Sequence, residues 1–126
     1  MAGNVLQGLS RDQFYSPGAL LNVAVDTSHP LTYGLRPVEA VWFQSGPAFE
    51  APVGGVEASA SEVLRYPRRD LLASGWLLGE RYLSDHAAVL DITIGAGHLI
   101  LFGIRPQYRA QSNAMFKMFF NGLYYR

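Results

Sequence analysis

Residues 87–104 carry the sequence pattern that most constrains the fold. Toward the end of residues 87–94, apolar side chains occupy every second position, as in a strand with one buried face. The glycines of Gly95-Ala96-Gly97 supply a tight turn, and residues 98–104 (HLILFGI) are apolar on both faces. This combination predicts a β-hairpin whose second strand lies in the middle of a sheet and is buried on both sides.

Other segments add strands and loops to this hairpin. Three segments have the composition and the bounding turn residues of strands: 19–25, 38–44 and 62–66. Residues 71–82 fit either a short strand or a broken helix, because Gly75 and Gly79 weaken a helical pattern. The small, glycine-containing residues 51–61 are typical of a surface loop. A short helix would fit residues 4–9.

The C-terminal segment predicts an amphipathic helix that follows the N-cap Ser112. Its apolar stripe recurs at i, i+3, i+4 and i+7 in Phe116, Phe119, Phe120 and Leu123, and Met115 widens it. Lys117 and Asn121 are expected to face water. The elements together predict an α+β fold, with a mixed sheet of about five or six strands and this helix packed on one face. We expect a single domain over residues 1–126.

Charged residues are scarce, and their balance excludes several classes of protein. They make up 16% of the chain, whereas about 25% is typical. Ten basic and ten acidic residues leave a net charge of zero, so there is no electrostatic footprint for a nucleic-acid partner. No apolar run approaches the roughly 20 residues of a membrane-spanning helix, so no membrane partner is expected. The absence of cysteine excludes disulfides, thiolate metal sites and cysteine nucleophiles.

The residues that most often carry catalysis show no catalytic spacing. The three histidines are far apart, with His29 expected in a turn, His86 in a loop and His98 at the start of a strand. None has the neighbouring ligand of a zinc site, so we expect no metal or other cofactor in this chain. Asp91 is interpreted as a solvated carboxylate. Ser45 lies in FQSGP, which lacks the first glycine of a nucleophile elbow.

One polar cluster remains, in residues 105–113 (RPQYRAQSN), between the second hairpin strand and the helix. Ligands of α/β sheets usually bind in a loop at the carboxyl end of a strand, and the N-terminus of the next helix favours an anion. The candidate ligand-binding residues are therefore Arg105, Arg109, Gln111, Ser112 and Asn113, with the two arginines as bidentate donors to a small anion or carboxylate. The alternative is that these side chains cap the loop's own carbonyls and brace a neighbouring segment.

Several stretches of the sequence resemble one family of proteins. They are FYSPG at residues 14–18, HPLTYG at 29–34, SGWLLGE at 74–80, LFGIRPQ at 101–107, FK at 116–117 and FN at 120–121. In this order they resemble the C-terminal region of large bacterial zinc-carboxypeptidase-like proteins, from Asn4 to Tyr125. Family members often have Gly-Gln-Thr-His where this chain has Ala110-Gln111-Ser112-Asn113. No role for a histidine in this loop can therefore be carried over.

The resemblance implies a place for this chain in a larger protein. In such proteins a carboxypeptidase domain carries the His, Glu and His zinc ligands, and a class I glutamine-amidotransferase-like domain follows it. This chain resembles the later half of that second domain, after the position of an amidotransferase's catalytic cysteine. No position here matches the zinc-ligand motif, so zinc and metallocarboxypeptidase activity are expected only in a parent catalytic domain. A secreted or periplasmic location is implied as well.

Two hypotheses of different classes follow from these observations. The first is a non-catalytic accessory domain that acts in packing, oligomerisation or substrate presentation, with its own upstream peptidase domain or a second copy as partner. The second is a small anion- or carboxylate-binding module that uses the 105–113 loop. The scarcity of charge favours the first, because a fragment of a larger domain has an apolar face that we expect self-association to cover.

Overall fold

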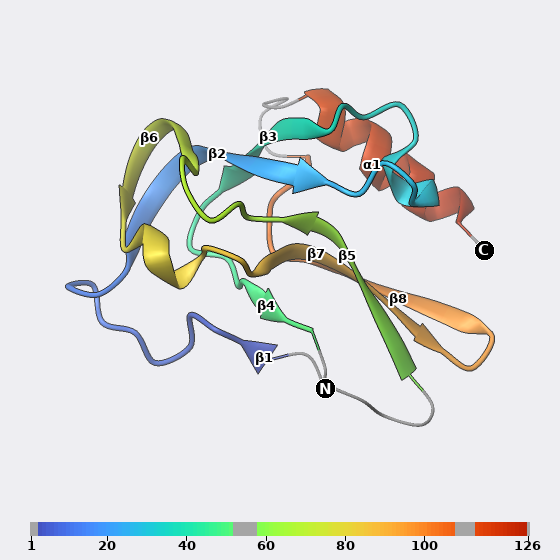
Figure 1. Ribbon diagram of the computed structural model, residues 1–126, viewed down its shortest axis with the longest axis horizontal. Coiled ribbons are helices and arrows are strands. Elements are labelled where there is room, and N and C mark those ends of the chain that lie inside the picture. Colours follow the sequence, from blue (N-terminus) through green and yellow to red (C-terminus); the bar gives the residue numbers. More distant parts are fainter. Residues whose placement is uncertain (1–2, 52–57, 108–112, 126) are drawn as a thin grey trace.

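The computed structural model describes residues 3–51, 58–107 and 113–125, and these residues form one sheet with an α-helix beside it (Figure 1). The elements in chain order are β1 (Gly3–Asn4), β2 (Tyr15–Val25), the 3-10 helix η1 (Pro30–Thr32), β3 (Val38–Phe43), β4 (Phe49–Glu50), β5 (Ala58–Arg65), β6 (Leu72–Leu78), the 3-10 helix η2 (Glu80–Tyr82), β7 (Ala87–Ile94), β8 (Gly97–Phe102) and α1 (Asn113–Tyr124). The predicted α+β class is confirmed. None of the described helices is long and apolar enough to cross a membrane.

The sheet has eight strands in the order β1-β4-β7-β5-β2-β3, with β6 also paired to β2 and β8 also paired to β7. The prediction of five or six strands was too low, because the two-residue β1 and β4 give no sequence pattern and the ambiguous 71–82 segment divides into β6 and η2. Every pairing among the described strands is antiparallel, where a mixed sheet was expected. The expected helix at residues 4–9 is wrong, since residues 5–8 form turns.

The predicted hairpin is present, but its second strand lies elsewhere in the sheet than expected. Ile94 pairs with Gly97 across a two-residue turn, and β8 pairs with β7 alone among the described strands. β8 is therefore an edge strand. Its apolar residues on both faces have two separate reasons, since Ile100 packs on the main core and Leu101 on a smaller cluster with Leu90.

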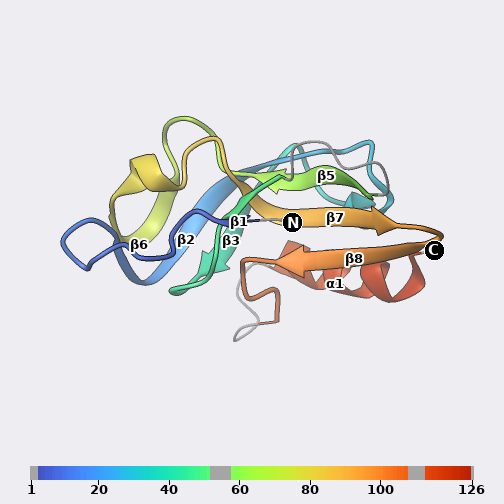
Figure 2. The ribbon, with the colours of Figure 1, turned by 90° about the horizontal axis from the view of Figure 1, so that it is seen from below.

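Helix α1 contacts η1 and is seen behind β8 in Figure 2, but it is rotated relative to the prediction. Met115 and Met118 are fully buried, whereas Phe120 is 55% and Leu123 is 66% exposed. Asn121, expected to face water, donates its Nδ2 to the carbonyl oxygens of Leu31 and Tyr33 at 3.0 Å each. The helix thus packs on η1 and the main core through methionines next to the aromatic stripe.

The main core lies on the α1 side of the sheet. Alternate residues of β2 (Ala19, Leu21 and Val23) are buried there, together with Val41 and Phe43 of β3. Residues next to them in each strand point to the opposite side. The two faces of the β2–β3 pair are therefore distinct, one against the core and one away from it.

Candidate functional site

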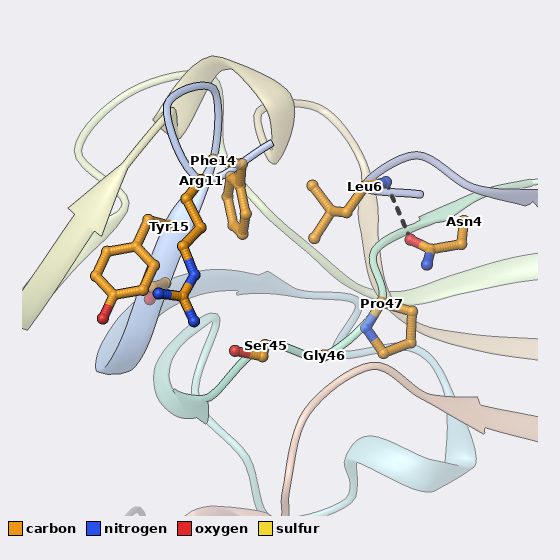
Figure 3. Close-up of a pocket in the computed structure, with 9 residues that line it drawn as sticks. Asn4, Leu6, Arg11, Phe14, Tyr15, Ser45, Gly46 and Pro47 are labelled. Atoms are coloured by element: carbon orange, nitrogen blue, oxygen red, sulfur yellow. Dashed lines mark hydrogen bonds between the residues drawn. The ribbon is translucent and has the colours of Figure 1, made fainter. Parts of the chain in front are cut away.

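A pocket of about 430 Å³ opens where β2 begins and β3 ends (Figure 3). Its polar wall contains Arg11 and Ser45, and its apolar wall contains Leu6, Phe14 and Pro47. The figure shows the guanidinium of Arg11 reaching toward Ser45, with Pro47 on the floor of the opening. We call this cavity the Arg11 pocket.

The local sequence places Arg11 at this opening through a tight turn. Ser10 and Gln13 have the capping-box spacing, and the Ser10 N–H donates to Gln13 Oε1 at 3.0 Å. In return the N–H groups of Gln13 and Phe14 donate to the Ser10 carbonyl at 3.0 and 2.9 Å. Arg11 lies inside this turn, and its guanidinium carbon is 5.6 Å from the centroid of the Tyr15 ring, within cation–π range.

Ser45, the other polar residue named above, belongs to a turn held in an uncommon backbone conformation. Ser45 has φ of 50°, a left-handed value that non-glycine residues seldom adopt. Gly46 follows, and a Cβ there would lie 2.5 Å from the carbonyl oxygen of Gly103. The turn is therefore pressed against the segment that follows β8, and only a glycine permits that approach. This packing holds Ser45 beside Arg11.

Arg11 differs from Arg36 and Arg68 in its ion-pair partners. Arg36 is 3.1 Å from Glu39, and Arg68 is 3.0 Å from Asp85. Within the part of the chain that the structure describes, Arg11 has no carboxylate partner. The residues that line the pocket include no acidic side chain. The positive charge of Arg11 is therefore not balanced by any described acidic side chain.

The ligand site expected in the 105–113 loop is only partly within the described structure. Arg105 is exposed and lines a smaller pocket of about 190 Å³ with Gln44, Ser45 and other residues. Its backbone N–H donates to the Trp42 carbonyl at 3.3 Å. The predicted binding residues Arg109, Gln111 and Ser112 lie outside the described residues, as does the side chain of Asn113, which begins α1.

A second polar cluster is centred on Asp91, whose interpretation as a solvated carboxylate is wrong. Asp91 is only 3% exposed. Asp91 Oδ1 is 3.0 Å from His98 Nδ1, and Oδ2 is 2.9 Å from His29 Nε2 and 2.8 Å from the Tyr125 hydroxyl. The carboxylate therefore joins β7, the turn before η1, the start of β8 and the residue after α1. We call these four residues the Asp91 cluster.

The hydrogen bonds define the tautomers of the two histidines. His29 Nδ1 accepts from the Leu31 N–H at 3.1 Å, so its hydrogen is on Nε2 and is donated to Asp91. An ionised carboxylate only accepts, so His98 donates from Nδ1. The rings of His98 and Tyr125 pack with centroids 4.3 Å apart. No group of three or more His, Asp or Glu side chains among the described residues could hold a metal ion.

The Asp91 cluster changes the acidity of two of its members. Burial by itself would raise the pKa of Asp91, but the hydrogen bonds from Tyr125, His98 and His29 outweigh it and lower that pKa below its usual value. Burial and the hydrogen bond to Asp91 raise the pKa of Tyr125. The native structure thus favours the ionised form of Asp91.

This lowered pKa predicts a loss of stability in acid. A carboxyl whose native pKa lies below its unfolded value stabilises the fold above the unfolded pKa, near about 3.9, and this contribution is lost as the pH falls through the native pKa. We expect the difference in unfolding free energy between the wild type and Asp91→Asn to be large at pH 5 and to shrink toward pH 2. Urea unfolding across this range measures it. Asp12→Asn, which replaces an exposed carboxyl, is the control. A stability difference for Asp91→Asn that does not change with pH would contradict the prediction.

The sequence motifs indicated neither the Arg11 pocket nor the Asp91 cluster, although one signal for the Asp91 cluster was present. In a hairpin with a two-residue turn after Ile94, residues 91 and 98 fall diagonally opposite on the same face. That register brings Asp91 and His98 together, but we assigned the turn to all of Gly95-Ala96-Gly97. No local pattern places His29 beside them, since 62 residues separate it from Asp91.

Comparisons with protein-family models, with curated proteins and with solved structures each gave no match to this chain.

Proposed function

We propose that this chain is a non-catalytic accessory domain of a zinc-carboxypeptidase-like protein, the later half of an amidotransferase-like domain. It works by packing against its own upstream peptidase domain or against a second copy. The sequence resemblance supports the parent protein. The observation that carries the packing role is an uncharged face of the sheet.

This outer sheet face consists of the side chains that point away from the core on three adjacent strands. It comprises Gly18, Leu20, Asn22 and Ala24 of β2, Val38, Ala40 and Trp42 of β3, and Ser74 and Trp76 of β6. None of these side chains is charged, Trp76 is 63% exposed, and Arg65 of β5, which pairs with Ala24, borders the face. The solvated face of an antiparallel sheet usually carries polar residues, whereas an uncharged face of this kind is typical of a surface that another protein covers.

Sedimentation of the purified chain tests this proposal. We expect the mass to rise above the 13.9 kDa of one chain at tens of micromolar. Trp76→Ser is expected to weaken the association by about tenfold or more, because an exposed aromatic side chain contributes strongly to an interface. The matched control is Phe120→Ser, which removes an exposed aromatic residue of α1 outside the outer sheet face.

Two results would overturn the proposal. One is a strictly monomeric wild type at tens of micromolar that also fails to bind a separately expressed upstream peptidase domain. The other is peptidase activity of this chain by itself that survives a metal chelator, because a non-catalytic domain has none.

A second candidate function is a small anion- or carboxylate-binding module that uses the 105–113 loop. The position of Arg105 in the smaller pocket beside Ser45 favours it. The variant that distinguishes this function is Arg105→Gln, because it removes the guanidinium from the smaller pocket.

A further inference from the structure

We propose that the Arg11 pocket binds a carboxylate that carries a small apolar group. This role is separate from the packing function, because none of the residues that line the Arg11 pocket belongs to the outer sheet face. Three properties of the pocket support this ligand: an arginine without a carboxylate partner, nearby neutral hydrogen-bond donors, and an apolar wall of suitable size.

The first property is the charge of Arg11. A guanidinium presents a planar fork of N–H donors that matches the two oxygens of a carboxylate. Other arginines of this chain use that fork within the protein, as Arg36 does with Glu39. Arg11 is stacked over Tyr15 instead, and no described carboxylate occupies its fork.

The second property is the set of neutral hydrogen-bond donors on the pocket walls. The Ser45 hydroxyl belongs to a residue kept in a left-handed conformation, the kind of local strain that occurs often at ligand sites. Asn4 turns its Oδ1 to the Leu6 N–H at 3.0 Å, which leaves Nδ2 as a donor. Figure 3 shows Ser45 below the guanidinium and Asn4 farther along the pocket. These donors add hydrogen bonds to an anion without adding an opposing charge.

The third property is the apolar wall, which excludes the simplest anions as preferred ligands. Leu6, Phe14 and Pro47 line the same opening, with Phe14 beside Arg11 and Leu6 farther along the pocket. The volume of about 430 Å³ is within the range of small-molecule sites, about 300–1,000 Å³. Acetate or phosphate would leave this wall in contact with water. A carboxylate with an aromatic or branched aliphatic group would cover it, either as a free acid or as the C-terminus of a peptide.

Titration of the ¹⁵N-labelled full chain tests the proposal. The probes are phenylacetate, its neutral analogue phenylacetamide, and the peptide N-acetyl-alanyl-phenylalanine with a free or an amidated C-terminus. We expect saturable amide shifts at Ser45, Gly46 and Tyr15 with the carboxylates and no saturable shifts with either amide. A stronger response to phenylacetate than to the free-terminus peptide identifies a free acid as the ligand, and the reverse order identifies a peptide C-terminus.

Variants separate this site from the other arginines. Arg11→Gln is expected to weaken carboxylate binding by at least about tenfold, and Arg11→Lys by less, since lysine keeps the charge but loses the fork. Ser45→Gly tolerates the left-handed backbone and removes the side chain with its hydroxyl, so it is expected to weaken binding without unfolding the chain. The matched controls Arg105→Gln and Arg69→Gln are expected to bind as the wild type does.

Three outcomes would overturn the proposal. The first is the absence of saturable shifts with any carboxylate up to tens of millimolar. The second is equal binding of phenylacetate and phenylacetamide, which would indicate an apolar cavity in which the charge of Arg11 has no role. The third is unchanged binding in a folded Arg11→Gln variant. Loss of binding in Arg105→Gln alone would assign the ligand to the 105–113 loop instead.

Discussion

Asp91→Ala is expected to lower the free energy of unfolding by about 3–5 kcal/mol, the cost of breaking a buried charged hydrogen-bond group. The substitution leaves the N–H groups of His29 and His98 and the hydroxyl of Tyr125 without their acceptor. Because these donors come from three segments, the turn before η1 and the residue after α1 lose the contact that joins them to β7. Urea unfolding followed by tryptophan fluorescence measures the loss.

Asp85→Asn is the control for Asp91→Ala, because Asp85 has φ of 61° and asparagine tolerates that left-handed backbone better than alanine. Asp85 is also paired, with Arg68 at 3.0 Å and Arg65 at 3.7 Å, but its side chain is 41% exposed. Exposed ion pairs contribute roughly 0–1 kcal/mol, so a small loss is expected. Equal losses for the two variants would mean that the burial of Asp91 adds nothing. A folded Asp91→Ala variant as stable as the wild type would show that the Asp91 cluster is not a structural contact.

Met118→Ala is expected to destabilise the chain by about 2–5 kcal/mol, as the truncation of a fully buried side chain does. Met118 is 0% exposed and belongs to the main core, where α1 meets η1 and the sheet. Phe120→Ala removes a larger side chain that is 55% exposed, and we expect a change within about 0.5 kcal/mol. Chemical unfolding of the two variants measures both effects.

This pair of variants distinguishes two rotations of the same helix. The aromatic stripe predicts that Phe116 lies in the core, whereas Phe116 is only partly buried in the structure. If Phe120→Ala were more destabilising than Met118→Ala, the sequence-based rotation would be right and the buried methionine face would be wrong.

Local patterns predicted the elements better than their positions in the sheet. The alternation of residues 87–94 and the glycines that follow were sufficient for the β7–β8 hairpin, because strand period and turn chemistry act over a few residues. They were not sufficient to identify β8 as an edge strand. Apolar residues on both faces of β8 are explained by α1 on one side and the Leu90 cluster on the other, and the partners of a strand depend on distant segments.

The helix also shows that local patterns predict an element better than its tertiary contacts. Spacing predicted a C-terminal amphipathic helix correctly, since the 3.6-residue period belongs to the helix itself. Two overlapping apolar stripes were available, one aromatic and one containing Met115 and Met118. Which of them is buried depends on the shape of the surface formed by η1 and β8. That shape is not encoded in the helix.

The candidate sites depend even more on distant contacts. Sequence reasoning selected the 105–113 loop because its polar residues are contiguous. The Asp91 cluster combines residues 29, 91, 98 and 125, and the Arg11 pocket combines a turn before β2 with a turn after β3. Neither the Asp91 cluster nor the Arg11 pocket corresponds to a contiguous sequence motif, so residue spacing does not reveal either of them.

The sequence by itself determined the α+β class, the hairpin, the C-terminal helix and the scarcity of charge, because each follows from residue type and short-range periodicity. The tertiary structure decided which helix face is buried, which strands lie at the edges, and which histidines meet Asp91. It also decided that Arg11 has no carboxylate partner among the described residues and that the outer sheet face carries no charge. These properties arise from contacts between segments far apart in the chain, which form only when the whole sheet closes around its core.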